Sequence, residues 1–329
     1  MQLHKYFSWV AVGFFLSATL IIFSMIASFG SHPEPGRWVA ECLQKKSIAV
    51  STIKPQVLII SGSNSLFGFS GKILSEKYGV PTVNLAVHAG LGPNYILSYG
   101  SQFIEKDRLF VLPFEYELYG HPSSESTFIY QVAGFDPHYF WNMPVIERLG
   151  FIFSASLLDR FKLLRYKLTD QPKSINNSYH YDSSSLNDYG DETANTLSNR
   201  TTAMLSGALK QRTHNLSINE DVWIAIKKFT NNAISAGGQV ALAYPNISNQ
   251  AIDIEKNNKF FYELRKRAEE AGIILIGKPE ESLFPEERIF DTYYHQNRIG
   301  QTTSTDRLYA NLHQAGLIKP VRSHQSAAD

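Results

Sequence analysis

Cysteine is almost absent from the sequence: Cys42 is the single one among 329 residues. One thiol excludes an intrachain disulfide and any metal site built from several cysteines. Excess charge is also missing, because the formal net charge is +1 and only 19% of the residues are charged. Nucleic-acid-binding proteins normally carry a basic patch or stripe. We therefore expect no nucleic-acid partner.

The sequence also lacks a glycine-rich phosphate-binding loop, a pair of histidines at metal-binding spacing and an internal repeat. We therefore expect neither a cofactor nor a bound metal. The length suits one large α/β domain with an insertion, or two smaller domains. Aromatic residues make up 13% of the chain. They favour a large core over a groove that faces carbohydrate.

Charged residues are missing from the run between Tyr6 and Gly30, which is apolar and long enough to cross a bilayer. Lys5 before it favours a cytoplasmic amino end. A cleavable signal peptide is the alternative, but Ala27-Ser28-Phe29 is a poor cleavage site and the apolar run is long. We predict a single-pass anchor in the inner (cytoplasmic) membrane, with the rest of the chain in the periplasm or outside the cell.

Short apolar runs alternate with helical patterns along much of the remaining chain. We predict strands over 57–60, 82–86, 108–113, 240–244 and 273–276, and helices over 69–78, 94–103, 219–234, 254–271 and 301–312. Short buried strands alternating with helices are typical of a parallel sheet covered on both faces. The predicted fold class is therefore α/β, a three-layer, doubly wound, flavodoxin-like parallel sheet with an N-terminal transmembrane helix and a central insertion.

The α/β pattern is lost between Gly120 and about Asn215, and residues 176–200 are rich in Ser, Asn, Asp and Tyr. Such a composition is typical of a long irregular loop. We expect an insertion here that borders or caps the site. The predicted domains are an anchor at 1–31, a linker with a short helix at 32–55, the α/β domain at 56–320 with the insertion at about 120–215, and a disordered tail at 321–329.

The stretch from Val57 to Gly71 carries the strongest functional signal. Its strand ends in Ser61-Gly62-Ser63-Asn64-Ser65, and α/β proteins place their chemistry at the carboxyl edge of the sheet. A serine becomes a nucleophile when a base takes its proton and an acid orients that base. Asp291 and His295 precede the last predicted helix and supply both groups from one loop. A turn cap for Ser63 and an ordinary hydrogen-bonding role for His295 are the plainer interpretations.

These residues resemble the sequence blocks of the SGNH/GDSL hydrolase superfamily, and within it the membrane-anchored envelope members of polysaccharide O-acetylation and teichoic-acid acylation. The first block has Gly-Asp-Ser where this chain has Ser61-Gly62-Ser63-Asn64. The run from Asn84 to Gly90 is similar to the second block. The run from Asp291 to His295 is similar to the final block, with three intervening residues instead of two.

The resemblance implies a role for each matched residue. Ser63 would be the nucleophile, and His295 the general base that Asp291 orients. The backbone N–H of Gly90 would help to hold the oxyanion, with Gly92 as the other candidate. Asn64, beside the nucleophile, is a further candidate donor.

Two departures from the family pattern concern the oxyanion site. Ser61 and Gly62 replace the usual opening glycine and aspartate, and the third block with its asparagine donor is absent. Glu115 follows the third strand instead, and a carboxylate donates no hydrogen bond unless it is protonated. Either Glu115 has a structural role, capping the loop or pairing with Arg298, or the oxyanion site is incomplete. His88 is an extra candidate donor.

The resemblance implies an envelope serine esterase or O-acyltransferase that acts on acyl groups, acetyl above all, of an extracellular or capsular polysaccharide. The expected partners are the polysaccharide or acyl donor, with His88 and Glu115 as candidate substrate contacts, and the membrane through the N-terminal helix. The alternative is a catalytically impaired accessory protein that binds a membrane acyltransferase or a polysaccharide export complex. The sequence does not distinguish an esterase from a transferase.

Overall fold

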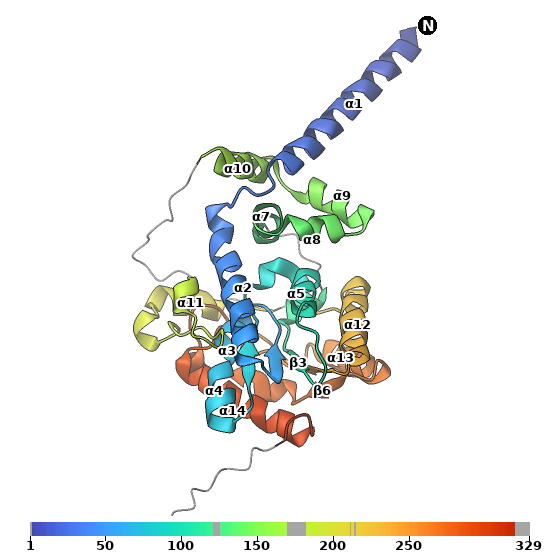
Figure 1. The fold of residues 1–329 in the computed structure, drawn as a ribbon. Coiled ribbons are helices and arrows are strands. Elements are labelled where there is room, and N and C mark those ends of the chain that lie inside the picture. Colours follow the sequence, from blue (N-terminus) through green and yellow to red (C-terminus); the bar gives the residue numbers. More distant parts are fainter. Residues whose placement is uncertain (1, 121–125, 170–181, 211, 214, 320–329) are drawn as a thin grey trace, which may run out of the picture. The chain divides into compact units, whose positions relative to one another are not determined.

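The computed structural model describes residues 2–120, 126–169, 182–210, 212–213 and 215–319 (Figure 1). The tail predicted at 321–329 lies outside these residues. The chain divides into two compact units. We call residues 1–40 with 124–178 the N-terminal unit, and residues 41–123 with 179–329 the sheet unit. The insertion expected at about 120–215 is thus divided between the two.

Within the described residues, five parallel strands form the main sheet of the sheet unit, in the order β2-β1-β3-β4-β6. Their bounds are β1 Val57–Ile59, β2 Thr82–Asn84, β3 Leu109–Leu112, β4 Gln239–Ala243 and β6 Ile274–Ile276. The predicted α/β class with a parallel sheet is confirmed. The chain passes from β1 to β2 on one side and returns to β3 on the other. Ligands of open parallel sheets bind outside the carboxyl ends of the strands at such a switch point.

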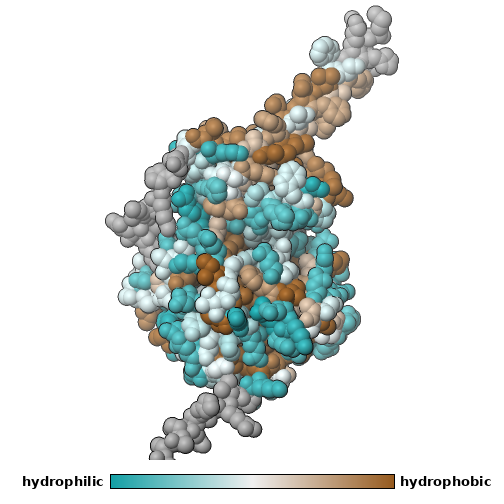
Figure 2. Space-filling model, in the orientation of Figure 1, coloured by the Kyte–Doolittle hydropathy of each residue, from teal (hydrophilic) through white to brown (hydrophobic). Residues whose placement is uncertain are grey.

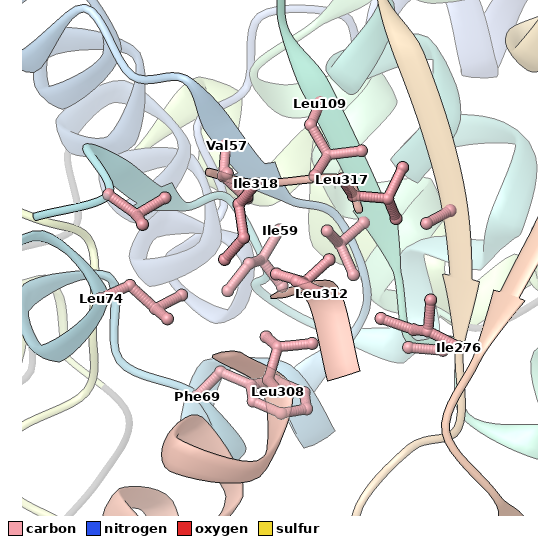
Figure 3. Close-up of a cluster of buried hydrophobic side chains, with 14 residues drawn as sticks. Val57, Ile59, Phe69, Leu74, Leu109, Ile276, Leu308, Leu312, Leu317 and Ile318 are labelled. Atoms are coloured by element: carbon pink, nitrogen blue, oxygen red, sulfur yellow. The ribbon is translucent and has the colours of Figure 1, made fainter. Parts of the chain in front are cut away.

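Alternate residues of each strand face opposite sides of the sheet. On one side, Val57 and Ile59 belong to an apolar cluster with Leu312 of α14 (Arg298–Gln314) and Leu74 of α4 (Gly71–Tyr78), shown in Figure 3. On the other side, Ile60 packs so closely on α5 (Gly92–Ser101) that a Cβ on Gly100 would lie 2.4 Å from Ile60 Cδ1.

The same second side is covered by α12 (Glu220–Ser235), whose Phe229 contacts Phe110 of β3 edge to face, with ring centroids 5.3 Å apart. The central strands β1 and β3 are therefore buried on both faces, which explains why they are apolar throughout rather than alternating. The further elements of the sheet unit are α3 Ser63–Gly68, α6 Tyr116–Gly120, α11 Thr202–Lys210, α13 Asn258–Glu270, the paired strands β5 Ile247–Ser248 and β7 Leu283–Phe284, and the 3₁₀ helices η1 Ala89–Leu91, η2 Ser183–Ser185, η3 Leu197–Asn199, η4 Pro279–Ser282 and η5 Glu286–Arg288.

The segment expected as a linker is helical over most of its length. Helix α2 spans Glu34–Ile53, and the division between the two units falls inside it. The sequence has no helix-breaking residue between Trp38 and Pro55. The helix ends just before Lys54, which has a φ of 51° and precedes that proline, as expected from the steric clash of proline with a helical neighbour.

Residues 182–200 are mostly irregular, and buried polar contacts hold them in the sheet unit. Asp191 is fully buried and accepts hydrogen bonds from Ser70 Oγ at 2.8 Å and Gly71 N at 2.6 Å, so it caps the start of α4. Asn195 Nδ2 donates to Gln296 O at 3.0 Å. This segment therefore supports the loop that carries His295.

The N-terminal unit contains α1 Gln2–Ala27, the first residues of α2, α7 Ser126–Gly134, α8 Pro137–Asn142, α9 Val145–Ser154 and α10 Leu157–Leu168. The part of α1 from Tyr6 to Ala27 has a mean hydropathy of 2.4 and is long and apolar enough to cross a membrane. Polar contacts join the shorter helices. Tyr130 Oη of α7, for example, donates to Asp159 Oδ1 of α10 at 2.7 Å.

Candidate active site

The turn after β1 leads directly into α3, of which Ser63 is the first residue. Gly62 precedes it, and a Cβ at Gly62 would lie 2.7 Å from Ala89 Cα and 2.5 Å from Glu115 Oε1. No side chain fits there. The structure thus brings together the predicted first and second blocks and the residue that replaces the third.

Glu115 caps this turn, which is one of the two structural roles expected for it. Its Oε1 accepts from Asn64 N at 2.9 Å, and its Oε2 accepts from Gly62 N at 3.2 Å. The guanidinium of Arg298 donates instead to Gln301 Oε1 at 3.0 Å. Burial raises the pKa of Glu115 from an ordinary 4.5 to about 7, against the opposing effects of the Asn64 N–H and His295.

Asn64 is fully buried, and its side-chain amide is engaged within the turn. The Nδ2 atom donates to Pro113 O at 2.8 Å, and Oδ1 accepts from Ser61 Oγ at 2.8 Å. The amide therefore ties the end of β1 to the end of β3. We assign Asn64 this structural role in place of the oxyanion contact that the sequence suggested.

Asp291 and His295 form the hydrogen-bonded pair that the sequence predicts. His295 Nδ1 lies 2.7 Å from Asp291 Oδ1, and both side chains are nearly buried, with 5% and 11% exposed. Phe290 N donates to His295 O at 2.8 Å and closes the loop, so the two side chains meet without a helix. A carboxylate on Nδ1 fixes the imidazole tautomer and orientation. The other nitrogen, Nε2, is then the one that can exchange a proton with a nucleophile.

Phe67 links this pair to α3. The rings of Phe67 and His295 are stacked, with centroids 4.1 Å apart and planes 8° from parallel. Phe67 follows Ser63 by four residues on the same helix, so both side chains lie on one face of α3. That face is therefore the one turned toward His295. Ser63 is partly exposed, whereas Asn64 and Ser65 are fully buried, so a substrate can reach it more readily.

A hydrogen bond joins His88 and Gly90. Gly90 N donates to His88 Nδ1 at 2.8 Å, so the N–H expected at the oxyanion is used within its own block. An acceptor role for Nδ1 places the proton of the neutral ring on Nε2. Burial and the nearby charge of His295 lower the pKa of His88 to about 4. At neutral pH this ring is therefore an uncharged donor.

Two contacts of the candidate site were not predicted from the sequence. One is Phe67, whose only sequence signal is its spacing of four residues from Ser63. The other is Glu117, which accepts from Tyr294 Oη at 2.6 Å and from Tyr293 Oη at 3.0 Å. Glu117 thereby ties the loop of Asp291 and His295 to the segment that follows β3. Its partners are distant in sequence, so no local pattern marks them.

The candidate site contains the groups for acyl transfer through a serine: a partly exposed hydroxyl, an oriented imidazole and a neutral donor. Among the residues that the structure describes, no cluster of three or more His, Cys, Asp or Glu side chains is arranged to hold a metal ion.

No protein-family model matches the chain, and no curated protein sequence matches it significantly. The resemblance to SGNH hydrolases therefore stays a prediction.

Proposed function

We propose that the chain is a membrane-anchored serine esterase or O-acyltransferase of the SGNH type, acting on acyl esters of an extracellular polysaccharide. The observation that carries the proposal is the hydrogen-bonded pair Asp291–His295, stacked on Phe67 one helical turn from Ser63. In the same proposal α1 crosses the inner membrane, and the sheet unit lies on its outer side.

In the proposed reaction, Ser63 Oγ attacks the acyl carbonyl carbon while His295 Nε2 takes the hydroxyl proton. Asp291 stabilises the imidazolium that forms. Collapse of the tetrahedral intermediate breaks the ester bond, and His295 returns the proton to the departing alcohol. Water or a sugar hydroxyl then attacks the acyl-enzyme by the same route in reverse, which releases an acid or a new ester.

The oxyanion needs donors that are already in position. The backbone N–H of Ser63 is one, because the first N–H groups of a helix have no intrahelical acceptor. His88 Nε2–H is the proposed second donor and takes the role that the family gives to an asparagine. Gly90 positions it through the bond to Nδ1. When Glu115 is protonated, it places no negative charge beside the developing oxyanion.

A second candidate function, a non-catalytic accessory protein, is favoured by one observation. Glu115 accepts from two backbone N–H groups of the turn, and His88 accepts from the N–H of Gly90. These three backbone donors are therefore already hydrogen-bonded within the protein. Such a protein would use the same surface to bind a membrane acyltransferase.

A labelling experiment distinguishes the two candidates. The full chain, purified in detergent, is treated with a fluorophosphonate probe and separately with an acetyl-ester reporter. We expect labelling and hydrolysis by the unmodified chain and loss of both in Ser63→Ala. Ser65→Ala, in the same turn, is the matched control and keeps both. A folded chain that shows neither reaction, and whose Ser63→Ala variant leaves polymer acylation in cells unchanged, overturns the enzyme proposal.

A further inference from the structure

The N-terminal unit exposes an apolar surface that its own packing leaves uncovered. Eight large apolar side chains of α9 and α10 are between 44% and 84% exposed. They are Val145, Ile146, Leu149 and Phe153 of α9, and Leu157, Leu158, Phe161 and Leu168 of α10. We call this set the α9–α10 apolar face. Apolar surface of this extent on a folded unit indicates an interaction site.

Each helix carries these side chains on one side only. In α9 the residues Val145, Leu149 and Phe153 are four apart, so they form a stripe along the helix. The opposite side is buried, where Phe151 packs on Phe128 with ring centroids 5.5 Å apart. The face is therefore not an exposed remnant of the core. It is a second apolar side on helices that already have a buried one.

Helix α10 is fixed to the last turns of α1. Arg160 Nη1 donates to Ile21 O at 2.9 Å, and Lys167 Nζ donates to Ala27 O at 2.7 Å. Ile21 precedes Ala27 by six residues, which is about 9 Å along a helix axis. Interfacial helices bury their apolar side about 5–10 Å into a bilayer. If α1 spans the membrane, α10 is held at that depth.

The exposed charges of α10 are of one sign, although α9 also exposes Glu147. Lys162, Arg165 and Lys167 are the exposed charged residues of α10, and all three are basic. Basic residues along the edge of an apolar stripe are typical of helices that lie on anionic lipid. Figure 2 shows hydrophobic surface continuing from α1 onto the helices at its carboxyl end.

We propose that the α9–α10 apolar face lies in the interfacial layer of the bilayer that α1 crosses, with anionic lipid as its occupant. The inference rests on the proposed anchoring by α1. Continuity with the membrane span and the basic edge both favour lipid over a protein partner. The N-terminal unit is then attached at two places, a spanning helix and an interfacial pair. Two attachments prevent the unit from turning about the axis of α1.

Depth measurements on the full chain test this inference. The chain is reconstituted in phosphatidylethanolamine–phosphatidylglycerol vesicles with single nitroxide labels in a Cys42→Ala background. Labels at Ile146→Cys and Phe161→Cys report on the face, Leu16→Cys on α1, and Lys266→Cys of α13 on water. Relaxation by oxygen and by a water-soluble nickel chelate gives the depth of each label. We expect the oxygen-to-nickel ratio at Ile146 and Phe161 to be several-fold above that at Lys266 and below that at Leu16.

The outcomes separate this inference from the proposal on which it rests. A membrane depth at Leu16 with water-like ratios at Ile146 and Phe161 overturns the inference and leaves the anchor standing. A water-like ratio at Leu16 overturns both. Low accessibility to both reagents at Ile146 and Phe161 indicates a protein partner or a second copy, and also overturns it. In Lys162→Glu/Arg165→Glu we expect a shallower Phe161 label, and a smaller change in vesicles without anionic lipid.

Discussion

The imidazole of His295 lies flat on the ring of Phe67, with centroids 4.1 Å apart, while its Nδ1 is held by Asp291. One contact fixes the plane of the ring and the other fixes its rotation within that plane. Because both contacts already hold the imidazole in one orientation, the ring loses no further conformational entropy when it takes a proton. Such pre-orientation would favour the proposed catalysis.

Replacing Asp291 by Asn tests the orienting contact. The amide NH2 can donate to Nδ1 and so hold the ring proton on Nε2, which is the wrong tautomer for a base, and we expect the rate of ester hydrolysis to fall by about 10³–10⁴-fold. The thermal unfolding midpoint should change little, because Asn has nearly the same size and shape as Asp. An activity within about threefold of the unmodified chain would contradict the triad.

Phe67→Leu tests the stacking contact, and it removes less side-chain volume than Phe67→Ala would. We expect kcat to fall by about ten- to a hundred-fold, because a ring shifted by about 1 Å is poorly placed to exchange a proton. The rate of fluorophosphonate labelling should fall in parallel. Phe69→Leu is the control, because the Phe69 ring packs in the apolar cluster of Figure 3, whereas Phe67 stacks on His295. Equal losses in both variants would indicate a general packing defect.

His88 offers a pair of variants that separate its two nitrogens. In His88→Asn an oxygen near the Nδ1 position can still accept from Gly90 N, but the Nε2–H donor is lost. In His88→Gln an amide N–H returns near the Nε2 position. We expect kcat to fall about 10²–10³-fold in the first variant and to recover in part in the second. Because the pKa of His88 is lowered to about 4, its titration should leave the rate between pH 6 and 8 unaffected. Equal activities of the two variants would remove His88 from the oxyanion site.

Glu115 predicts a pH dependence of stability. Its pKa is about 7 in the folded chain and 4.5 as an ordinary value, so the folded state binds more protons between these limits. The free energy of unfolding should therefore be highest below about pH 4.5 with respect to this group, and fall by about 3 kcal/mol as the pH rises through 7. Glu115→Gln should remove most of this slope. Denaturant unfolding of the full chain in detergent from pH 4.5 to 8 measures it, and identical slopes in the two proteins would contradict the assignment.

Local patterns in the sequence were sufficient to predict the sheet and the Asp291–His295 pair. Runs such as Val57 to Ile60 are apolar throughout and end at small polar residues, which is typical of strands buried on both faces. The grouping of residues 124–178 with the N-terminal helix was not predicted, because it depends on contacts such as Tyr130–Asp159 and Arg160–Ile21. The use of the Gly90 N–H by His88 was missed for a related reason: it requires the 3₁₀ conformation of the following residues.

Gly62 has a consequence for how the sequence can diverge. A Cβ there would meet the Glu115 carboxylate, but also the backbone of Ala89 at 2.7 Å. Shortening Glu115 relieves the first clash and not the second, because no substitution at residue 89 removes its Cα. Descendants of this chain that keep the turn can therefore exchange Glu115 only for a residue that still accepts from the N–H groups of Gly62 and Asn64, while position 62 has to remain glycine.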